Sequence, residues 1–282
     1  MNNSEMWLSP SSIIYFNSCP LKFYFRYILK LKEIPTVHLI KGSAIHKTLE
    51  KLFENKKYLK DDYCVDLKKT INLLLDNELT NLNSLNLTIF EKEEHINDSK
   101  QIITNFTNKL IEKIECLLLS HKAENPTHAF HLLKPKFKEL SLQDNELKVR
   151  GIIDRIQIGF DDKITIVDYK TSNKFGNELS SDYELQLAIY AYLYYKNNKG
   201  RIPDKLCVNY LRFGESFYLN GNLDLINYAI YNIKNVRNFI VNNNDKQECY
   251  FRKQSPLCSY CSFKEKCLKE EKNEDKQPRL SI

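Results

Sequence analysis

The sequence predicts a mixed α/β fold, and three observations support this prediction. Segments rich in β-branched and apolar residues, separated by turn-forming residues, predict a three-stranded meander at residues 136–142, 146–158 and 163–170. Helices and strands then alternate, with helices at 178–197 and 223–242 and strands at 205–213 and 215–219. Hydrophobic residues make up 42% of the 282 residues, which is enough to fill a sizeable core.

The N-terminal part of the chain has a helical pattern. Ser9 and Pro10 are typical of an N-cap and a first helical position, so a short helix should begin there and end at Cys19. A break is expected at Lys41-Gly42-Ser43, followed by a mostly helical region at 44–125. Within this region, the helical periodicity over 61–121 is interrupted near 81–86.

We therefore expect one domain over residues 1–282, with an α/β core at 130–245. The last residues, 271–282, are rich in Lys and Glu and are expected to form a flexible tail.

Composition excludes several classes of protein. Glycine and proline together account for 15 residues, too few for collagen-like or low-complexity architectures. No apolar run approaches the roughly 20 residues of a membrane span, and the start lacks the pattern of a secretory signal. We therefore expect a cytoplasmic protein without a membrane partner, whose eight cysteines are thiols or metal ligands. The net charge of +6 is modest for a nucleic-acid binder, so any such binding should be local to a groove instead of spread over the surface.

Two aspartates interrupt the apolar strands of the predicted meander. If residues 159–163 form the turn, Ile158 faces Ile164, and the same antiparallel register places Asp154 opposite Asp168. Lys170 would lie on the same face, because side chains alternate along a strand. Two close carboxylates repel unless a proton or a cation intervenes, and such oxygen ligands suit Mg²⁺ or Mn²⁺. The alternative is a salt-bridged ladder at a strand end.

The segments Gly-x-x-Asp-Arg at 151–155 and Val-Asp-Tyr-Lys-Thr at 167–171 resemble the core of the PD-(D/E)xK nucleases. The likeness is to the RecB-like branch, which includes CRISPR-associated exonucleases and AddB-type nucleases. It implies a restriction-endonuclease-like core, a mixed central sheet flanked by helices. It also implies that Asp154 and Asp168 bind metal and that Lys170 is the catalytic lysine. Two positions depart from the motif: Ile153 replaces proline, and the second acid is aspartate.

Two further motifs extend this resemblance. Gln186 and Tyr190 match a Gln-x-x-x-Tyr motif, lie on one helical face and would line the site and hold DNA, although an ordinary amphipathic helix gives the same pattern. Residues 42–46 resemble a Gly-x-x-x-His segment, which would make His46 a metal ligand. Glu139 could assist as an additional acid, but the register of the first hairpin does not place it.

Three cysteines, Cys258, Cys261 and Cys267, form a C-x2-C-x5-C run. RecB-like nucleases with an iron–sulfur cluster pair such a run with one N-terminal cysteine, which here would be Cys19. The resemblance thus implies a [4Fe-4S] cluster in a module of residues 9–30 and 249–270. Zinc also accepts four cysteines, and Cys249 is an alternative ligand. Simple packing suits the remaining cysteines, Cys64, Cys116 and Cys207.

Together these features predict a Mg²⁺- or Mn²⁺-dependent DNA nuclease, with an exonuclease acting on single strands or ends as the leading form. The resemblance implies a role in DNA repair and recombination or in CRISPR spacer acquisition. The sequence contains no G-x-x-x-x-G-K-[ST] motif, so a helicase or a CRISPR integrase would be a separate partner. Two alternatives stay open: a catalytically silent, nuclease-derived DNA-binding or scaffold subunit, and a zinc-stapled binding protein.

Overall fold

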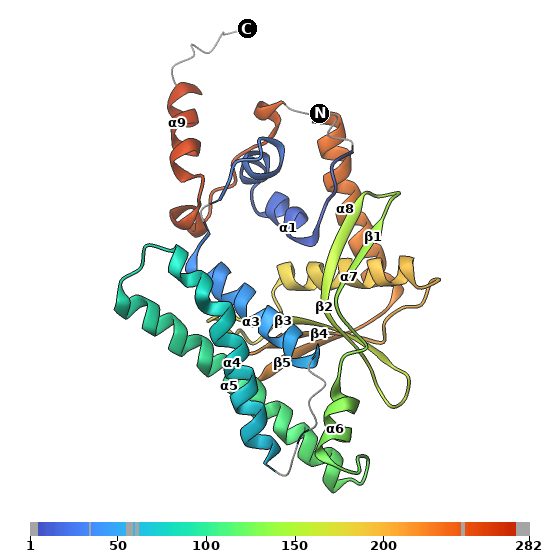
Figure 1. Cartoon of the computed structure of the whole chain (residues 1–282). Coiled ribbons are helices and arrows are strands. Elements are labelled where there is room, and N and C mark those ends of the chain that lie inside the picture. Colours follow the sequence, from blue (N-terminus) through green and yellow to red (C-terminus); the bar gives the residue numbers. More distant parts are fainter. Residues whose placement is uncertain (1–4, 34, 55–58, 60–61, 244–245, 275–282) are drawn as a thin grey trace. The chain divides into compact units, whose positions relative to one another are not determined.

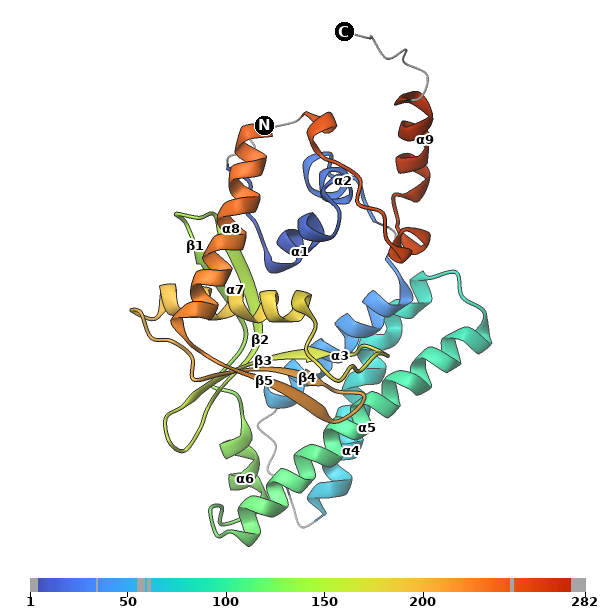
Figure 2. The same cartoon turned by 180° about the vertical axis from the view of Figure 1, so that it is seen from behind.

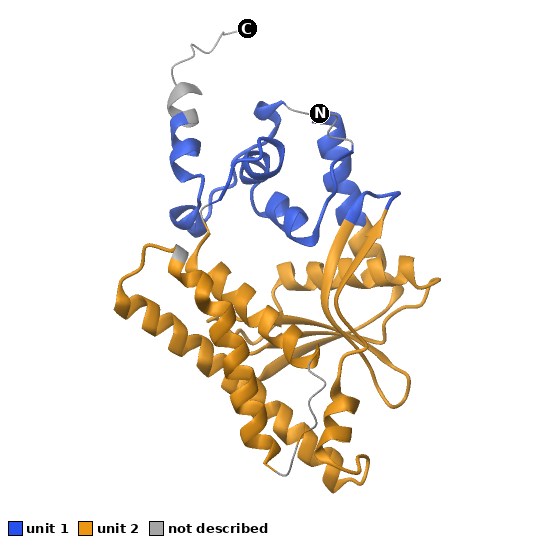
Figure 3. Ribbon diagram, viewed as in Figure 1, with its two compact units in different colours: residues 1–34, 145–149, 231–282 blue, residues 35–144, 150–230 orange. Residues whose placement is uncertain are grey.

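The computed structural model in Figure 1 describes residues 5–33, 35–54, 59, 62–243 and 246–274. The chain divides into two compact units (Figure 3). The first unit comprises residues 1–34, 145–149 and 231–282, and the second comprises 35–144 and 150–230. Among the helices in the described ranges, none is both long and apolar enough to cross a bilayer.

The second unit is built around a five-stranded sheet in which the strands lie in chain order. The strands are β1 (Phe137–Asp144), β2 (Val149–Ile158), β3 (Ile164–Lys170), β4 (Lys205–Tyr210) and β5 (Glu215–Asn220). β3 and β4 are parallel, whereas β2–β3 and β4–β5 are antiparallel. A parallel pair needs a crossover, which is made by α7 (Ser181–Asn197). The predicted mixed α/β class is therefore confirmed.

The predicted register of the β2–β3 hairpin is also confirmed. Ile158 pairs with Ile164, and the ladder continues in the same register to Arg155 and Val167. The turn is closed by the Gly159 N–H, which donates to the carbonyl of Lys163 at 2.8 Å. A short turn leaves little freedom for a register slip, and a one-residue slip would turn the buried isoleucines toward the other face.

Four helices of the second unit, α3 to α6, form a layer on one side of the sheet (Figures 1 and 2). They are α3 (Val37–Glu54), α4 (Tyr63–Leu79), α5 (Ile89–Leu119) and α6 (Pro126–Leu133), with a 3₁₀ turn at Thr80–Ser84. Thr88 and Glu91 form a capping box that starts α5. The apolar stripes of these helices share one core with Tyr169 and Leu211 from the sheet side.

The expected break at residues 41–43 was wrong, because α3 continues through it. Lys41 is only 4% exposed and forms a salt bridge with Asp98 of α5. Asp98 also pairs with Arg212, which follows β4. This buried pairing and the neighbouring apolar core stabilise a helical conformation that the local sequence does not favour.

The opposite side of the sheet is covered by α7, which has buried residues around most of its circumference. Ser180 caps its N-terminus by accepting from the Tyr183 N–H. Gly151 allows β2 to approach this helix closely. A Cβ atom at this position would lie 3.0 Å from Leu193 and 3.2 Å from Tyr190.

The first unit contains short helices and an aromatic core. Its helices are α1 (Pro10–Ser18), α2 (Pro20–Phe23), α9 (Lys264–Glu274) and the part of α8 (Leu223–Asn243) that follows residue 230. It also contains a π turn (Tyr24–Ile28) and two 3₁₀ turns (Gln247–Cys249 and Pro256–Tyr260). The predicted cap at Ser9 is present as a capping box with Ser12. Fully buried Tyr250 packs against Phe23, Tyr24 and Phe239.

The predicted tail at 271–282 begins within the last helix. Residues 271–274 form the last turn of α9. Residues 275–282 lie outside the described part of the chain.

Candidate active site

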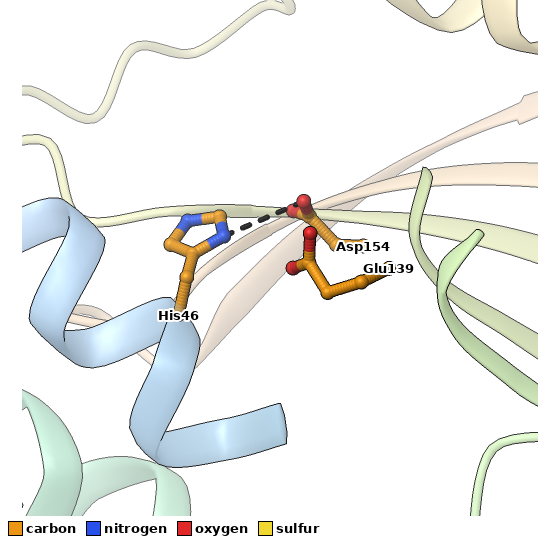
Figure 4. Close-up of side chains that lie close together, drawn as sticks. All are labelled: His46, Glu139 and Asp154. Atoms are coloured by element: carbon orange, nitrogen blue, oxygen red, sulfur yellow. Dashed lines mark ion pairs between the residues drawn. The ribbon is translucent and has the colours of Figure 1, made fainter. Parts of the chain in front are cut away.

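Three side chains that can bind a metal ion converge in the second unit. His46 comes from α3, Glu139 from β1 and Asp154 from β2, and one ligand atom of each lies within 4.8 Å of the other two. Figure 4 shows the imidazole and the two carboxylates pointing toward one another. All three are half-buried. The group is thus held by the fold and is still accessible to a ligand.

The backbone of Tyr169 fixes two members of this group. Its N–H donates to Asp154 Oδ2 at 2.8 Å, and its carbonyl oxygen lies 3.1 Å from His46 Nε2. Since a carbonyl only accepts, His46 Nε2 carries the hydrogen in this contact. A neutral His46 would then direct the lone pair of Nδ1 toward Asp154 Oδ1, 3.4 Å away. Two acceptors that face each other call for a proton or a cation between them.

Electrostatics at this group agree with that geometry. Burial by itself would lower the pKa of His46, but the hydrogen bond and charge of Asp154, together with Asp168 and Glu139, raise it overall. Burial and the charge of Asp154 raise the pKa of Glu139. The site therefore has an excess of negative charge, which a divalent cation would neutralise.

Glu139 is the site residue that the sequence could not place. It lies in β1 but has a φ of +46°, in the left-handed region that a side chain with a Cβ seldom adopts. Strained backbone of this kind is concentrated at functional sites. The sequence signal was an acid within a predicted strand. It was insufficient because it gives no register for β1 against β2.

Asp168 and Lys170 form a second cluster close to the first. Asp168 is 2% exposed, and its Oδ2 lies 2.7 Å from the Lys170 ammonium group. Burial raises the pKa of Asp168 to about 6, against the opposing effect of Lys170 and with a further increase from Asp154. Asp168 is not a member of the 4.8 Å group. The third member of that group is Glu139, while Asp168 lies near enough to affect the pKa of His46.

Gln186 of α7 holds Asp168 and Lys170 together. Its Nε2 donates to Asp168 Oδ1 at 2.9 Å, and its Oε1 accepts from Lys170 Nζ at 2.7 Å. The same Nε2 lies 3.0 Å from the hydroxyl oxygen of Tyr190, one turn further along α7. Tyr190 is buried, so in this structure it supports Gln186 from behind. The two residues predicted to line the site do lie together beside it.

The motifs of this site lie within a match to the family model described as "PD-(D/E)XK nuclease superfamily", which covers residues 7–268. The chain belongs to the PD-(D/E)XK nuclease superfamily. Nucleases of this superfamily use divalent metals, and the imidazole and carboxylate oxygens of the 4.8 Å group are suitable ligands for Mg²⁺ or Mn²⁺.

Curated relatives of this superfamily member include two proteins that are each named as a subunit of an ATP-dependent helicase/deoxyribonuclease. The one from Streptococcus mutans is 27% identical over 182 residues, which cover 61% of this chain and 15% of the relative. The one from Clostridium perfringens is 28% identical over 204 residues, which cover 67% of this chain and 17% of the relative. The chain thus spans about a sixth of the length of these relatives.

A solved structure shares the fold of this PD-(D/E)XK protein. It is the crystal structure of a protein from Eubacterium rectale described as a candidate exonuclease. The TM-score is 0.53 and the sequence identity 12%, and the alignment covers 99% of this chain and 91% of the other. At this identity the likeness concerns the fold alone.

Arg155, the last residue of the Gly-x-x-Asp-Arg motif, does not join the 4.8 Å group. It donates to the hydroxyl of Tyr169 at 3.1 Å and to the carbonyl of Leu133 at 3.0 Å, and it lies over the ring of Phe53. It also lines a cavity of about 340 Å³ that contains none of the predicted site residues. Arg155 therefore ties the sheet to the helical layer and supports Tyr169, whose backbone fixes Asp154 and His46.

The first unit brings the four predicted cluster cysteines to one cavity of about 130 Å³, lined by Cys19, Cys258, Cys261 and Cys267. Lys22, Arg252 and Lys264 also line it, and no acid does. Cys249 is not among the lining residues. Cys64, Cys116 and Cys207 belong to the second unit, where Cys207 is buried and Cys116 is exposed.

The distances between the four cysteine sulfurs can be compared with those in a zinc site. Within the described residues, no three of these sulfurs all lie within 4.8 Å of one another. A tetrahedral zinc site has sulfurs only roughly 3.8 Å apart, given a Zn–S distance of about 2.3 Å. The four sulfurs line the cavity without three of them lying as close together as the ligands of a zinc ion.

Proposed function

We propose that this chain is a divalent-metal-dependent deoxyribonuclease that hydrolyses phosphodiester bonds, acting as an exonuclease on single-stranded DNA or on DNA ends. The observation that carries the proposal is the 4.8 Å group of His46, Glu139 and Asp154 beside the Asp168–Lys170 ion pair, within one compact unit. A salt-bridged ladder alone would explain Asp168 and Lys170. It would not explain why His46, Glu139 and Asp154 also converge, with one ligand atom of each within 4.8 Å of the other two.

Each residue has a distinct part in the proposed hydrolysis. His46, Glu139 and Asp154 would hold Mg²⁺ or Mn²⁺, and Asp168 lies close enough to influence them electrostatically. A bound divalent ion lowers the pKa of its water and polarises a phosphoryl oxygen. Lys170 would stabilise negative charge that develops on the phosphate.

Gln186 would keep the Lys170 ammonium group in place, since it accepts from Nζ and donates to Asp168 at the same time. Tyr190, packed behind Gln186, restricts its rotation. These contacts fix the position of a flexible lysine before substrate binds, which is the condition for effective electrostatic catalysis.

We further propose that Cys19, Cys258, Cys261 and Cys267 hold a [4Fe-4S] cluster. Support comes from the separation of the sulfurs and from the three cations that line the cavity and would offset the negative charge of four thiolates. Such a cluster would join positions that are 239 residues apart in sequence, and closing so long a loop is entropically costly. Its role would be structural.

The proposed biological role is DNA repair and recombination or CRISPR spacer acquisition in the cytoplasm. The curated relatives are named as helicase/deoxyribonuclease subunits, which supports a helicase as partner. This sequence has no G-x-x-x-x-G-K-[ST] motif, so unwinding would come from another protein. A CRISPR integrase is the corresponding partner in spacer acquisition.

The test is degradation of end-labelled single- and double-stranded DNA by anaerobically purified protein, with Mn²⁺, with Mg²⁺ or with EDTA. The Lys170→Ala variant is run beside the parent, with Lys163→Ala as control because Lys163 pairs with Asp161 in the exposed turn. We expect metal-dependent degradation by the parent and the control, and a loss of roughly 100- to 1,000-fold in Lys170→Ala. If folded, iron-loaded parent is inert with both metals, the scaffold function replaces the nuclease.

A further inference from the structure

An aromatic cluster lies beside the Lys170 ammonium group and is not used by the proposed hydrolysis. It consists of Phe175 from the segment between β3 and α7, Tyr183 from α7, Tyr210 from β4, and Phe213 and Phe217 from the β4–β5 hairpin; we call it the aromatic platform. Phe175 is at its centre, with its ring 5.2 Å from Tyr210 and 5.3 Å from Phe213 and from Phe217.

The aromatic platform is continuous with the candidate active site. Lys170 Nζ lies 4.6 Å from the ring centroid of Tyr183, a cation–π contact. The Tyr183 ring is 6.1 Å from that of Tyr210, and Tyr210 is the partner of Lys170 in the parallel β3–β4 ladder. A chain of ring contacts therefore leads from the ammonium group to Phe175.

The outer rings of the platform are not buried. Phe175 is 42% exposed and Phe213 is 39% exposed, whereas Tyr210 beneath them is buried. These two exposed rings are adjacent, with their centroids 5.3 Å apart. Adjacent exposed rings typically mark a binding surface. Exposed Lys174 precedes Phe175 and adds positive charge to the same segment.

We propose that the aromatic platform stacks an unpaired base of the substrate strand, next to the phosphate presented to Lys170. Aromatic rings stack on any base, and together with positive charge they form the usual surface for single-stranded DNA. A base within a duplex has both faces covered by its neighbours and cannot reach such a surface without being unstacked. This inference rests on the proposed nuclease function and deepens it, because it makes single-stranded DNA the preferred substrate.

The first test compares Phe175→Ala with Phe175→Trp and Phe175→Leu. Phe160→Ala is the matched control, because Phe160 is 69% exposed in the β2–β3 turn. For single-stranded DNA, KM should rise roughly 5- to 150-fold in Phe175→Ala and Phe175→Leu and stay near the parent value in Phe175→Trp. Hydrolysis of bis(p-nitrophenyl) phosphate, which has no base, should be unchanged in all variants.

Leucine separates stacking from packing, since it keeps apolar contacts but lacks a π face. Parent-like KM in Phe175→Leu would overturn the proposal and make the aromatic platform a packing element. Equal losses in Phe175→Ala and Phe160→Ala would also overturn it, because the effect would then not belong to this position.

A second test requires no turnover. Metal-free Lys170→Ala protein is titrated with single-stranded oligonucleotides that carry one 2-aminopurine, moved stepwise along the strand. Quenching at one position, lost on adding Phe175→Ala, supports stacking; uniform fluorescence overturns it. If quenching is found but the parent degrades no DNA, the proposed nuclease function fails while the base-stacking site stands.

Discussion

The carboxylate–imidazole site and the cysteine cavity are built in different ways. Backbone hydrogen bonds from one strand residue, Tyr169, fix Asp154 and His46, and the ligand atoms already lie within 4.8 Å of one another. The four cysteines lie on or next to short helices and 3₁₀ turns, and their sulfurs are further apart. A site on a sheet is thus preformed by the fold. In the proposed function, the bound cluster would hold the short elements that carry the cysteines together.

The largest expected effect tests the cysteine side of this comparison. Cys261→Ser should release iron, lower the soluble yield and lower the melting temperature, because a bound cluster contributes directly to folding free energy. Iron content and thermal unfolding of anaerobically purified protein provide the measurement. Cys116→Ser is the control, since Cys116 is exposed and lies outside the cavity. Full iron content and unchanged stability in Cys261→Ser would contradict the proposal that a cluster stabilises the first unit.

Removal of metal should distinguish the two sites. Treatment with EDTA should abolish DNA degradation but shift the melting temperature little, because the fold already positions His46, Glu139 and Asp154. Loss of iron should shift the melting temperature strongly. An EDTA-treated parent that unfolds like Cys261→Ser would show that the carboxylate–imidazole site is not preformed.

The next effect concerns the ion-pair cluster that supports α3, the helix that carries His46. Asp98→Ala should lower the free energy of unfolding by about 3–5 kcal/mol, since it leaves the buried Lys41 ammonium group without its partner. Urea denaturation measures the change. Asp76→Ala removes an exposed partner of Lys100 and should cost at most about 1 kcal/mol. Equal costs for the two variants would contradict the supporting role of Asp98.

The same cluster predicts a dependence of stability on pH. Hydrogen bonds from Arg212 and Lys41 hold the pKa of Asp98 well below its usual range. The unfolded chain therefore binds this proton at a higher pH than the folded chain, so stability rises with pH in the acid range. The contribution should be complete above about pH 4 and be lost as the pH falls further. Asp98→Asn should show a shallower loss of stability below about pH 4 than the parent.

The smallest expected effect concerns Gln186, which positions the Lys170 ammonium group beside the carboxylate–imidazole site. Gln186→Ala should lower kcat roughly 10- to 100-fold, because Lys170 loses the acceptor that fixes its ammonium group. Gln186→Glu keeps an acceptor for Lys170 but loses the donor to Asp168, so it should recover only part of the rate. Gln101→Ala, on the exposed face of α5, serves as control. Unchanged kcat in Gln186→Ala would mean that the Asp168 ion pair alone positions Lys170.

Local patterns were sufficient to predict much of this protein. The strands, α7, the cap at Ser9 and the β2–β3 register depend on residues that are near in sequence, and each is found as predicted. The same register predicted that Asp154, Asp168 and Lys170 lie near one another, whereas the membership of the 4.8 Å group had to come from the structure. Motif spacing selected Cys258, Cys261 and Cys267, the family resemblance added Cys19, and all four line one cavity.

Tertiary structure decided what depends on contacts between distant segments. The helical conformation of α3 at Lys41 depends on Asp98, which pairs with both Lys41 and Arg212. Asp98 and Arg212 lie 57 and 171 residues after Lys41 in the sequence. Glu139 lies in the site in a left-handed conformation, which no sequence pattern specifies for glutamate. The aromatic platform gathers rings from four separate elements beside Lys170. Periodicity and short turns record local preferences, whereas these juxtapositions arise only when the sheet and its helices pack together.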